Sequence, residues 1–238
     1  MKTVIIIPTY CEADNIRKLI PAIKKQKTLS NYDFEILVVD DNSPDKTSDV
    51  VRDFIKSDQK IHLLTGNKRG LGVAYIKGMQ YAIEKLAAEV VIEMDADFSH
   101  NPDDISKLIS EIENGAGFVI GSRYVKGGKI RNWSFFRHFL SGLGNQIVRQ
   151  ALGLQKVQDV TAGFRAIKTD LIKKVKLDSI KANGYSFQVW LLYSAYKKGA
   201  KIKEVPVEFV DRKIGKTKIG FWDIIEGIII LFKLKFYV

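Results

Sequence analysis

Short apolar runs rich in β-branched residues alternate, along the first half of this chain, with segments whose apolar residues recur at helical spacing. The apolar runs cover residues 3–8, 34–39, 61–64, 90–94 and 118–120. The helical segments cover residues 13–27, 43–56, 73–86 and 101–113. Runs of this kind are typical of strands buried on both faces, and their alternation with helices indicates βαβ units. The sequence therefore predicts a single α/β domain with a mainly parallel sheet flanked by helices.

Polar clusters follow four of these predicted strands, at the points where the strands end. They are Tyr10 with Glu12, Asp40 with Asp41, Lys68 with Arg69, and Asp95 with Asp97. The carboxyl ends of parallel strands meet at one edge of a sheet, and open α/β sheets bind their ligands there. We therefore expect one site built from several loops.

Asp95 and Asp97 follow a buried run and are separated by a single residue. Two carboxylates in this arrangement can hold a hard divalent cation, and Mg²⁺ or Mn²⁺ held there can neutralise a diphosphate leaving group. The same pattern in an exposed loop is usually an ordinary turn, so the position after a buried strand carries the metal interpretation. Asp40 has a competing structural role, because it can cap the next helix through Ser43.

Charge is distributed unevenly between the two halves of the chain. Residues 1–113 carry 15 Lys and Arg against 19 Asp and Glu, a balance of −4, whereas residues 114–238 carry 23 against 8, a balance of +15. No acidic residue occurs between positions 114 and 158. This asymmetry predicts an anionic partner, which could be nucleic acid, an anionic membrane surface or a phosphorylated substrate. The alternative is a solubilising surface, although such surfaces usually mix both signs.

The cellular location is constrained by cysteine and by hydropathy. The lone cysteine, Cys11, excludes an intrachain disulfide and favours a reducing compartment. The first residues lack the pattern of a signal peptide. The apolar stretch at 224–232 contains Glu226 and is far shorter than the roughly 20 residues that a bilayer requires. We expect a cytoplasmic protein without a membrane span.

Several ordered motifs together resemble the family 2 glycosyltransferases, and most closely the branch of polyprenyl-phosphate hexosyltransferases that includes the dolichol-phosphate mannose synthases. The motifs are Pro8-Thr9-Tyr10-Cys11-Glu12, residues 38–47, Asp95-Ala96-Asp97, Gly121-Ser122-Arg123-Tyr124, residues 159–165 and residues 184–188. The resemblance implies a GT-A fold, a nucleotide-sugar donor, a divalent metal and a lipid-phosphate acceptor.

The resemblance also implies roles for single residues. Asp95 and Asp97 would handle the metal and the donor diphosphate, and the remaining donor contacts would come from Pro8, Tyr10, Glu12, Asp40, Arg212 and Lys218. Three positions depart from the pattern of this branch, which usually has Asn at Cys11, often Gln at Ser99 and commonly an acid at Trp190. We expect Cys11 to be a buried spacer.

Residues 134–152 predict an amphipathic helix with two separate rows. One row is apolar (Phe135, Phe139, Leu143, Ile147 and Ala151) and the other is polar (Arg137, Ser141, Asn145 and Arg149). The apolar row can face lipid or the core while the polar row faces a phosphate; the alternative is an ordinary core helix with one wet side. We expect Arg123, Arg131, Arg137 and Ser141 to bind the acceptor phosphate, since guanidinium groups contact phosphate bidentately. Asp159 is either a further polar contact or a structural partner of Arg165.

Residues 221–238 predict a second amphipathic helix, which would follow a catalytic domain over residues 1–220. Its apolar surface could lie in a membrane interface, on the sheet or on a partner subunit, and a membrane-anchoring subunit is among the partners we expect. The basic segment 212–218 resembles the family's loop that closes on the donor phosphates.

The sequence thus predicts an inverting enzyme that transfers a hexose to a polyprenyl or dolichyl monophosphate at the cytoplasmic face of a membrane. Mannose from GDP-mannose is the expected donor group, with a UDP-hexose as the other candidate. The acceptor oxygen is already anionic near neutral pH, so no general base is required, and Arg123 joins Asp95 and Asp97 as the expected catalytic residues. The alternatives are a transferase that acts on a glycan or protein hydroxyl, which would need a base, and a non-catalytic basic protein at the membrane surface. A nucleic acid is not an expected partner.

Overall fold

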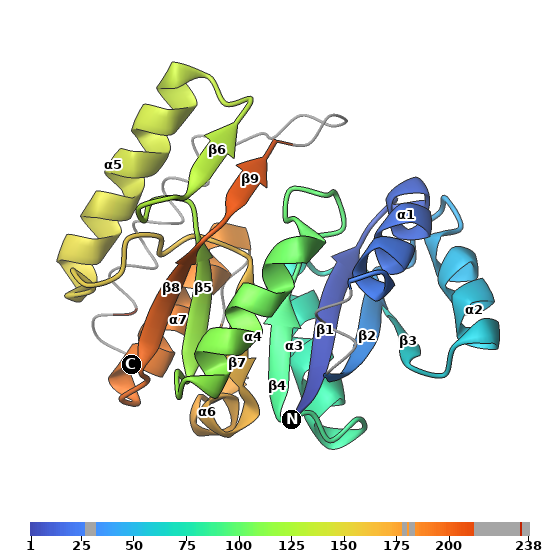
Figure 1. Ribbon diagram of the computed structural model, residues 1–238. Helices are drawn as coiled ribbons and strands as arrows, with labels where there is room; N and C mark the ends of the chain where they lie inside the picture. Colours follow the sequence, from blue (N-terminus) through green and yellow to red (C-terminus); the bar gives the residue numbers. More distant parts are fainter. Residues whose placement is uncertain (27–31, 178–179, 181–183, 212–233, 235–238) are drawn as a thin grey trace.

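The computed structural model describes residues 1–26, 32–177, 180, 184–211 and 234. At its centre lies a seven-stranded sheet with the order β3-β2-β1-β4-β7-β5-β8 (Figure 1). Its strands are β1 (Lys2–Thr9), β2 (Asp33–Asp40), β3 (Ile61–Thr65), β4 (Val90–Glu93), β5 (Phe118–Ser122), β7 (Arg165–Lys168) and β8 (Ile202–Pro206). Only β7 runs antiparallel to its neighbours, β4 and β5. The predicted α/β architecture with a mainly parallel sheet is confirmed.

Helices cover both faces of this sheet. They are α1 (Ala13–Lys24), α2 (Thr47–Ser57), α3 (Leu71–Glu84), the short 3₁₀ helix η2 (Pro102–Asp104), α4 (Ile105–Glu113), α5 (Phe135–Leu152), α6 (Thr169–Lys174) and α7 (Gly184–Lys197). Successive residues of β1 serve opposite faces, because side chains alternate along a strand. Val4 and Ile6 join the core under α3, α6 and α7, whereas Ile5 and Ile7 join the core under α1, α2 and α4.

The start of α2 differs from the prediction of a helix from residue 43. Residues 43–46 form a loop whose side chains instead serve the first turn of α1. Ser43 Oγ accepts a hydrogen bond from the Cys11 N–H at 2.9 Å, and Asp45 Oδ2 accepts one from the Ala13 N–H at 3.0 Å. Thr47 Oγ1 accepts from the Glu12 N–H at 3.0 Å. These acceptors satisfy N–H groups that a helix start leaves unpaired, and they tie the loop after β1 to the loop after β2.

The second half of the chain adds a layer beyond the carboxyl ends of the strands (Figure 1). Strands β6 (Lys129–Arg131) and β9 (Glu208–Val210) form a parallel ribbon that the sequence did not predict. Helix α5 confirms the predicted helix over 134–152 almost to the residue, and the Ser134 side chain caps it by accepting from the Arg137 N–H. No helix in the described ranges is both long enough and apolar enough to cross a membrane.

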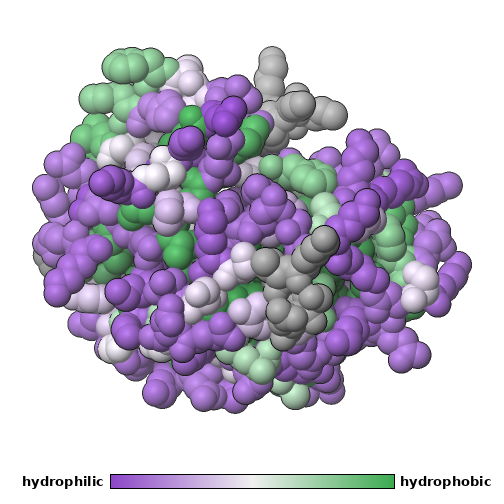
Figure 2. Space-filling model, viewed as in Figure 1, coloured by the Kyte–Doolittle hydropathy of each residue, from purple (hydrophilic) through white to green (hydrophobic). Residues whose placement is uncertain are grey.

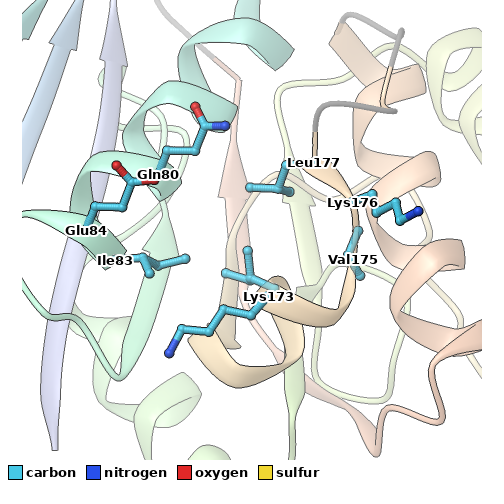
Figure 3. A pocket seen from close by; sticks show the side chains of 8 residues that line it. Gln80, Ile83, Glu84, Lys173, Val175, Lys176 and Leu177 are labelled. Carbon is cyan, nitrogen blue, oxygen red and sulfur yellow. The ribbon is translucent and has the colours of Figure 1, made fainter.

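An open groove of about 490 Å³ lies between the end of α3 and the residues that follow α6 (Figure 3). Ile83 and Val175 line it together with Lys173 and Lys176. Because α3 begins after the carboxyl end of β3 and ends near the amino end of β4, this groove lies at the opposite edge of the sheet from the predicted site. The predicted second segment, residues 221–238, lies outside the described residues apart from Leu234.

Candidate active site

The loops after β1, β2 and β4 adjoin one another, because β1 pairs in parallel with both β2 and β4. Loops at the carboxyl edge of adjacent parallel strands share one crevice. The structure therefore brings together the predicted donor residues near Tyr10, Asp40 and Asp95.

The crevice wall after β1 exposes an aromatic ring. Tyr10 is 43% exposed, and Lys68 Nζ lies 3.4 Å from its ring centroid. Glu12 Oε2 accepts a hydrogen bond from Asn15 Nδ2 at 2.5 Å. Pro8 is half-buried at the end of the same strand. The arrangement offers a flat ring beside a cation, which suits the stacking of a nucleobase and the binding of an anion; the donor roles of Pro8, Tyr10 and Glu12 stay predictions.

Asp40 does not cap α2, which begins at Thr47 with Lys46 at its N-cap, so the predicted capping role was wrong; its carboxylate instead ties the end of β1 to the loop after β2. Its carboxylate is completely buried, and it accepts hydrogen bonds from Thr9 Oγ1 at 2.9 Å and from the Ser43 N–H at 3.1 Å. Ser43 Oγ and Ser48 Oγ also donate to it, at 2.5 and 2.6 Å. Both of its oxygens are thus occupied by protein groups, and its role in donor binding stays a prediction. The adjacent carboxylate, Asp41, is half-buried, and burial raises its pKa although the Arg69 backbone and nearby lysines oppose this.

Cys11 is exposed, so the expectation of a buried spacer was wrong. Its backbone adopts a φ of 60°, in the left-handed region that Asn tolerates better than most residues. The Asn that the family usually carries at this position therefore fits the backbone, and Cys11 keeps the same turn at a small conformational cost.

The predicted metal residues lie in the loop that follows β4, next to the loop after β1. The Asp95 side chain is 34% exposed, and Asp97 is half-buried with its Oδ1 accepting from the Ser99 N–H at 3.0 Å. Across the described residues, no cluster of three or more Asp, Glu, His or Cys side chains forms a complete metal cage. The protein thus offers two carboxylates, and ligand oxygens or water would have to complete the coordination of a cation.

Two residues that the sequence did not single out hold Asp95 in place. The Tyr75 hydroxyl donates to Asp95 Oδ1 at 3.2 Å, and the Asp95 N–H donates to His100 Nδ1 at 3.1 Å. His100 is nearly fully buried and stacks on Phe164 with ring centroids 5.0 Å apart. Burial lowers the pKa of His100, so the ring is neutral near pH 7 and can accept from the backbone at Nδ1. In the sequence, only the position of His100, five residues after Asp95, could have indicated that it contacts this loop.

Glu93, two residues before Asp95, is buried close to Arg165. Arg165 Nε lies 4.0 Å from Glu93 Oε2, and both side chains are completely buried. Arg165 also donates to the carbonyl oxygens of Gln188 and Val160, at 2.7 and 3.0 Å. Burial raises the pKa of Glu93 to about 8 and lowers that of Arg165 to about 10, since low polarity disfavours both charges. Arg165 therefore ties the segment after Val160 to α7.

Arg123 is paired with Asp159, so the alternative pairing of Asp159 with Arg165 was wrong. Arg123 Nε and Nη2 each donate to Asp159 at 2.7 Å, its backbone N–H donates to the same carboxylate at 3.1 Å, and Nη2 also reaches Thr161 Oγ1 at 3.0 Å. Asp159 is completely buried, which raises its pKa, but the Arg123 charge and hydrogen bonds outweigh burial and hold the pKa below its usual range. The predicted contact of Arg123 with the acceptor stays a prediction, and its observed contacts are internal.

The two rows of α5 face in opposite directions. On the polar row, Ser141 Oγ accepts from the Tyr124 hydroxyl at 2.7 Å, and the buried Asn145 accepts from the Val160 N–H at 2.8 Å. On the apolar row, Phe135 and Phe139 are 87% and 58% exposed, and the neighbouring Phe136 is 68% exposed. Figure 2 shows hydrophobic surface gathered where Figure 1 places this helix. The polar row therefore packs on the protein, and the apolar row faces outward.

The two other predicted acceptor arginines, Arg131 in β6 and Arg137 in α5, both form ion pairs. Arg131 pairs with Glu208, and Arg137 pairs with Asp211. The Arg137 guanidinium also lies 4.3 Å from the ring centroid of Trp133. Arg123 lies 5.4 Å from the same ring, so Trp133 is a shared platform for two guanidinium groups that are distant in sequence. The sequence analysis missed Trp133.

Two predicted donor residues, Arg212 and Lys218, lie outside the described residues. Of the positions that depart from the family pattern, Ser99 and Trp190 are both buried. Neither the Ser99 hydroxyl nor the Trp190 indole N–H has a hydrogen-bond partner among the described residues. Trp190 therefore belongs to the core under α7, where an acid would be costly.

Comparison with known sequences gives a consistent result. The profile of glycosyl transferase family 2 matches residues 4–176. Polyprenol monophosphomannose synthase of Mycolicibacterium smegmatis is 37% identical over 228 residues, which are 95% of this chain and 84% of that protein. Undecaprenyl-phosphate mannosyltransferase of Micrococcus luteus is 38% identical over 221 residues, 92% of this chain and 88% of that protein. Dolichol-phosphate mannosyltransferase of Pyrococcus furiosus is 35% identical over 236 residues, 98% of this chain but 64% of that protein.

Solved structures agree on the fold. Glucosyl-3-phosphoglycerate synthase from Mycobacterium tuberculosis, in complex with phosphoglyceric acid, superimposes with a TM-score of 0.70 at 16% identity, covering 98% of this chain and 79% of that one. Its complex with Mn²⁺, UDP and glucosyl-3-phosphoglycerate gives a TM-score of 0.69 at 17% identity, with the same coverage. At these identities the likeness concerns the fold alone, and it confirms the expected GT-A architecture.

Proposed function

Because the chain belongs to glycosyl transferase family 2, we propose that it transfers a mannosyl group from GDP-mannose to a polyprenyl monophosphate. The product would be a lipid-linked mannose that serves other enzymes as a sugar donor. A single displacement at the anomeric carbon would invert its configuration.

The observation that carries this proposal is the agreement among three relatives. All three are 35–38% identical to this chain over more than nine-tenths of its length. Each name joins mannose with the phosphate of a polyprenol, an undecaprenol or a dolichol. The geometry supports the same class of acceptor, since α5 turns its polar row towards Tyr124 and Thr161 and its phenylalanines outward. The outward phenylalanines would meet the hydrocarbon tail of such an acceptor, and Arg137 and Ser141 its anionic head.

The site fits a divalent cation. Asp95 and Asp97 are two partly exposed carboxylates, one residue apart, after the end of β4, and hard cations such as Mg²⁺ and Mn²⁺ take carboxylate oxygens together with phosphate oxygens and water. When bound there, the cation would neutralise charge that develops on the departing diphosphate. The Tyr75 hydroxyl donates to the Asp95 carboxylate and His100 accepts from the Asp95 backbone N–H, so the residue is held in place before a cation binds.

The chain's own residues would chiefly align the two reactants. The acceptor phosphate oxygen is anionic near neutral pH, so no side chain has to remove a proton from it. Arg137, stacked on Trp133, and the Ser141 hydroxyl would orient that phosphate. Holding both reactants in one crevice converts an encounter in solution into a step within one complex.

The proposed location is the cytoplasmic face of a membrane. The outward phenylalanines of α5 and the positive balance of residues 114–238 favour an anionic lipid surface. A membrane-anchoring subunit and an interfacial role for residues 221–238 belong to the same proposal.

The test uses purified protein, undecaprenyl phosphate in detergent, Mg²⁺, and labelled GDP-mannose, UDP-glucose and UDP-galactose in parallel. We expect label in the organic phase from GDP-mannose alone, and at least about a hundredfold less from the folded Asp97→Asn variant. Asp103→Asn, which removes a nearby exposed carboxylate, is the matched control and should retain activity. Transfer from a UDP-sugar instead, or full activity of Asp97→Asn, would contradict the proposal.

A further inference from the structure

Arg137 is paired with a carboxylate at the start of α5. It lies in the first turn of α5, where the helix dipole favours negative charge, and its guanidinium stacks on Trp133 at 4.3 Å. The anion is the Asp211 carboxylate. Both side chains are only 22% exposed, so this pair is largely shielded from solvent.

Asp211 comes from outside the segment that holds Arg137, which contains no acidic residue. No acidic residue occurs from position 114 to position 158, and the carboxylate reaches Arg137 from the end of β9. The Asp211 N–H donates to the Arg131 carbonyl oxygen at 3.3 Å, which continues the pairing of the β6–β9 ribbon. The backbone of the ribbon therefore delivers this side chain to the arginine.

A carboxylate and a phosphate monoester compete for the same guanidinium groups. Both accept two parallel N–H bonds, but the phosphate carries more charge and a further terminal oxygen for a neighbouring donor such as a hydroxyl. We propose that Asp211 holds the place of the acceptor phosphate in the acceptor-free protein, and that it sets how strongly the site binds that phosphate. The inference rests on the proposed function, because it takes Arg137 as an acceptor residue.

Trp133 would hold the Arg137 guanidinium in place while the acceptor phosphate replaces Asp211. The indole ring is in contact with Arg137 and also packs edge-on against His138, with centroids 5.5 Å apart. The guanidinium thus keeps its position on the ring when its counter-ion changes. Asp211 would thereby make the site selective for phosphate monoesters, because a dianion can displace the carboxylate from Arg137 whereas a weakly bound monoanion cannot.

The experiment measures binding without a donor, so it does not depend on catalysis. Geranyl phosphate and inorganic phosphate are each titrated into the full chain by calorimetry, for the wild type, Asp211→Asn and Asp49→Asn. Asp49 forms an exposed ion pair with Arg52 on α2, so its variant makes the same change of charge elsewhere.

We expect Asp211→Asn to bind geranyl phosphate about three to ten times more tightly than the wild type, the range set by the loss of one partly shielded ion pair. Asp49→Asn should match the wild type, and inorganic phosphate should bind more weakly than geranyl phosphate throughout. In turnover assays, the KM for the lipid phosphate should fall in Asp211→Asn while the KM for the donor stays constant.

Unchanged or weaker binding by Asp211→Asn would overturn the inference, because the carboxylate would then organise Arg137 rather than compete for it. Absence of binding in all three proteins would overturn it as well. A gain seen with inorganic phosphate alone would mean that the site serves free phosphate. If the wild type binds geranyl phosphate but transfers no mannose to any polyprenyl phosphate, the proposed function fails while the anion exchange at Arg137 stands.

Discussion

Replacing Phe135, Phe136 and Phe139 with serine should release the protein from lipid bilayers. The three residues are 87%, 68% and 58% exposed, and a buried aromatic side chain covers roughly 200 Å², so together they leave about 400 Å² of apolar surface in water. At about 25 cal/mol per Å², complete transfer of that area into lipid would be worth about 10 kcal/mol, and immersion of half of it about 5 kcal/mol.

Part of this free energy is offset by the lost freedom of a protein held at a surface. We therefore expect the triple variant to partition into anionic liposomes at least about a hundredfold more weakly, which corresponds to about 2.7 kcal/mol. Sedimentation of the protein with liposomes of phosphatidylcholine and phosphatidylglycerol measures the partition coefficient.

The matched control is Gln146→Ser with Gln150→Ser, which changes two exposed polar residues of the same helix. Its partition should equal that of the wild type. Circular dichroism verifies that each variant keeps its helices. Equal sedimentation of the triple variant and the wild type, with both folded, would refute the assignment of this face to lipid.

Three further predictions concern Asp159 and Tyr75. Asp159→Asn should lower the free energy of unfolding by about 3–5 kcal/mol in urea titrations, since it leaves the buried Arg123 guanidinium without its counter-charge, and a loss below about 1 kcal/mol would argue against this. Because the folded state lowers the pKa of Asp159, its stabilisation is complete above the unfolded pKa of about 4 and is lost as the pH falls through the folded value. The stability gap between wild type and Asp159→Asn should therefore narrow below pH 4, and a gap that widens on acidification would contradict the pairing. Tyr75→Phe should raise the Mg²⁺ concentration for half-maximal activity by about tenfold, the effect of one hydrogen bond to a charged group, and unchanged metal dependence would remove Tyr75 from the site.

Five strands of the sheet, β1 to β5, were predictable because they are continuous apolar runs, a composition that indicates burial on both faces. Strands β7 and β8 were not predicted. Strand β7 has four residues and includes the buried Arg165, whose place depends on Glu93 and on α7 rather than on any local pattern, and β8 carries Lys203 and Glu204 and so is not a continuous apolar run. The ribbon of β6 and β9 was missed for a similar reason, because three-residue strands carry no usable periodicity.

The site residues, too, include some that the sequence predicts and others that only the fold reveals. Asp95 and Asp97 follow directly from their position after a strand, and the structure places both in the crevice. The partners of the arginines could not be read from the sequence, since Arg123 and Asp159 are 36 positions apart and Arg137 and Asp211 are 74 apart. Only the folded chain shows which carboxylate neutralises which guanidinium. Cys11 was misplaced because its side chain follows a left-handed backbone conformation that hydropathy does not reveal.

The central claim is that this chain joins mannose to the phosphate oxygen of a polyprenyl phosphate with inversion. The most direct measurement is the phosphorus and proton NMR spectrum of the lipid product formed from GDP-α-mannose and undecaprenyl phosphate. The account predicts a phosphodiester whose mannose is β-linked at C1, and no product when undecaprenol replaces its phosphate. An α-linked product, or transfer to the free hydroxyl, would contradict it.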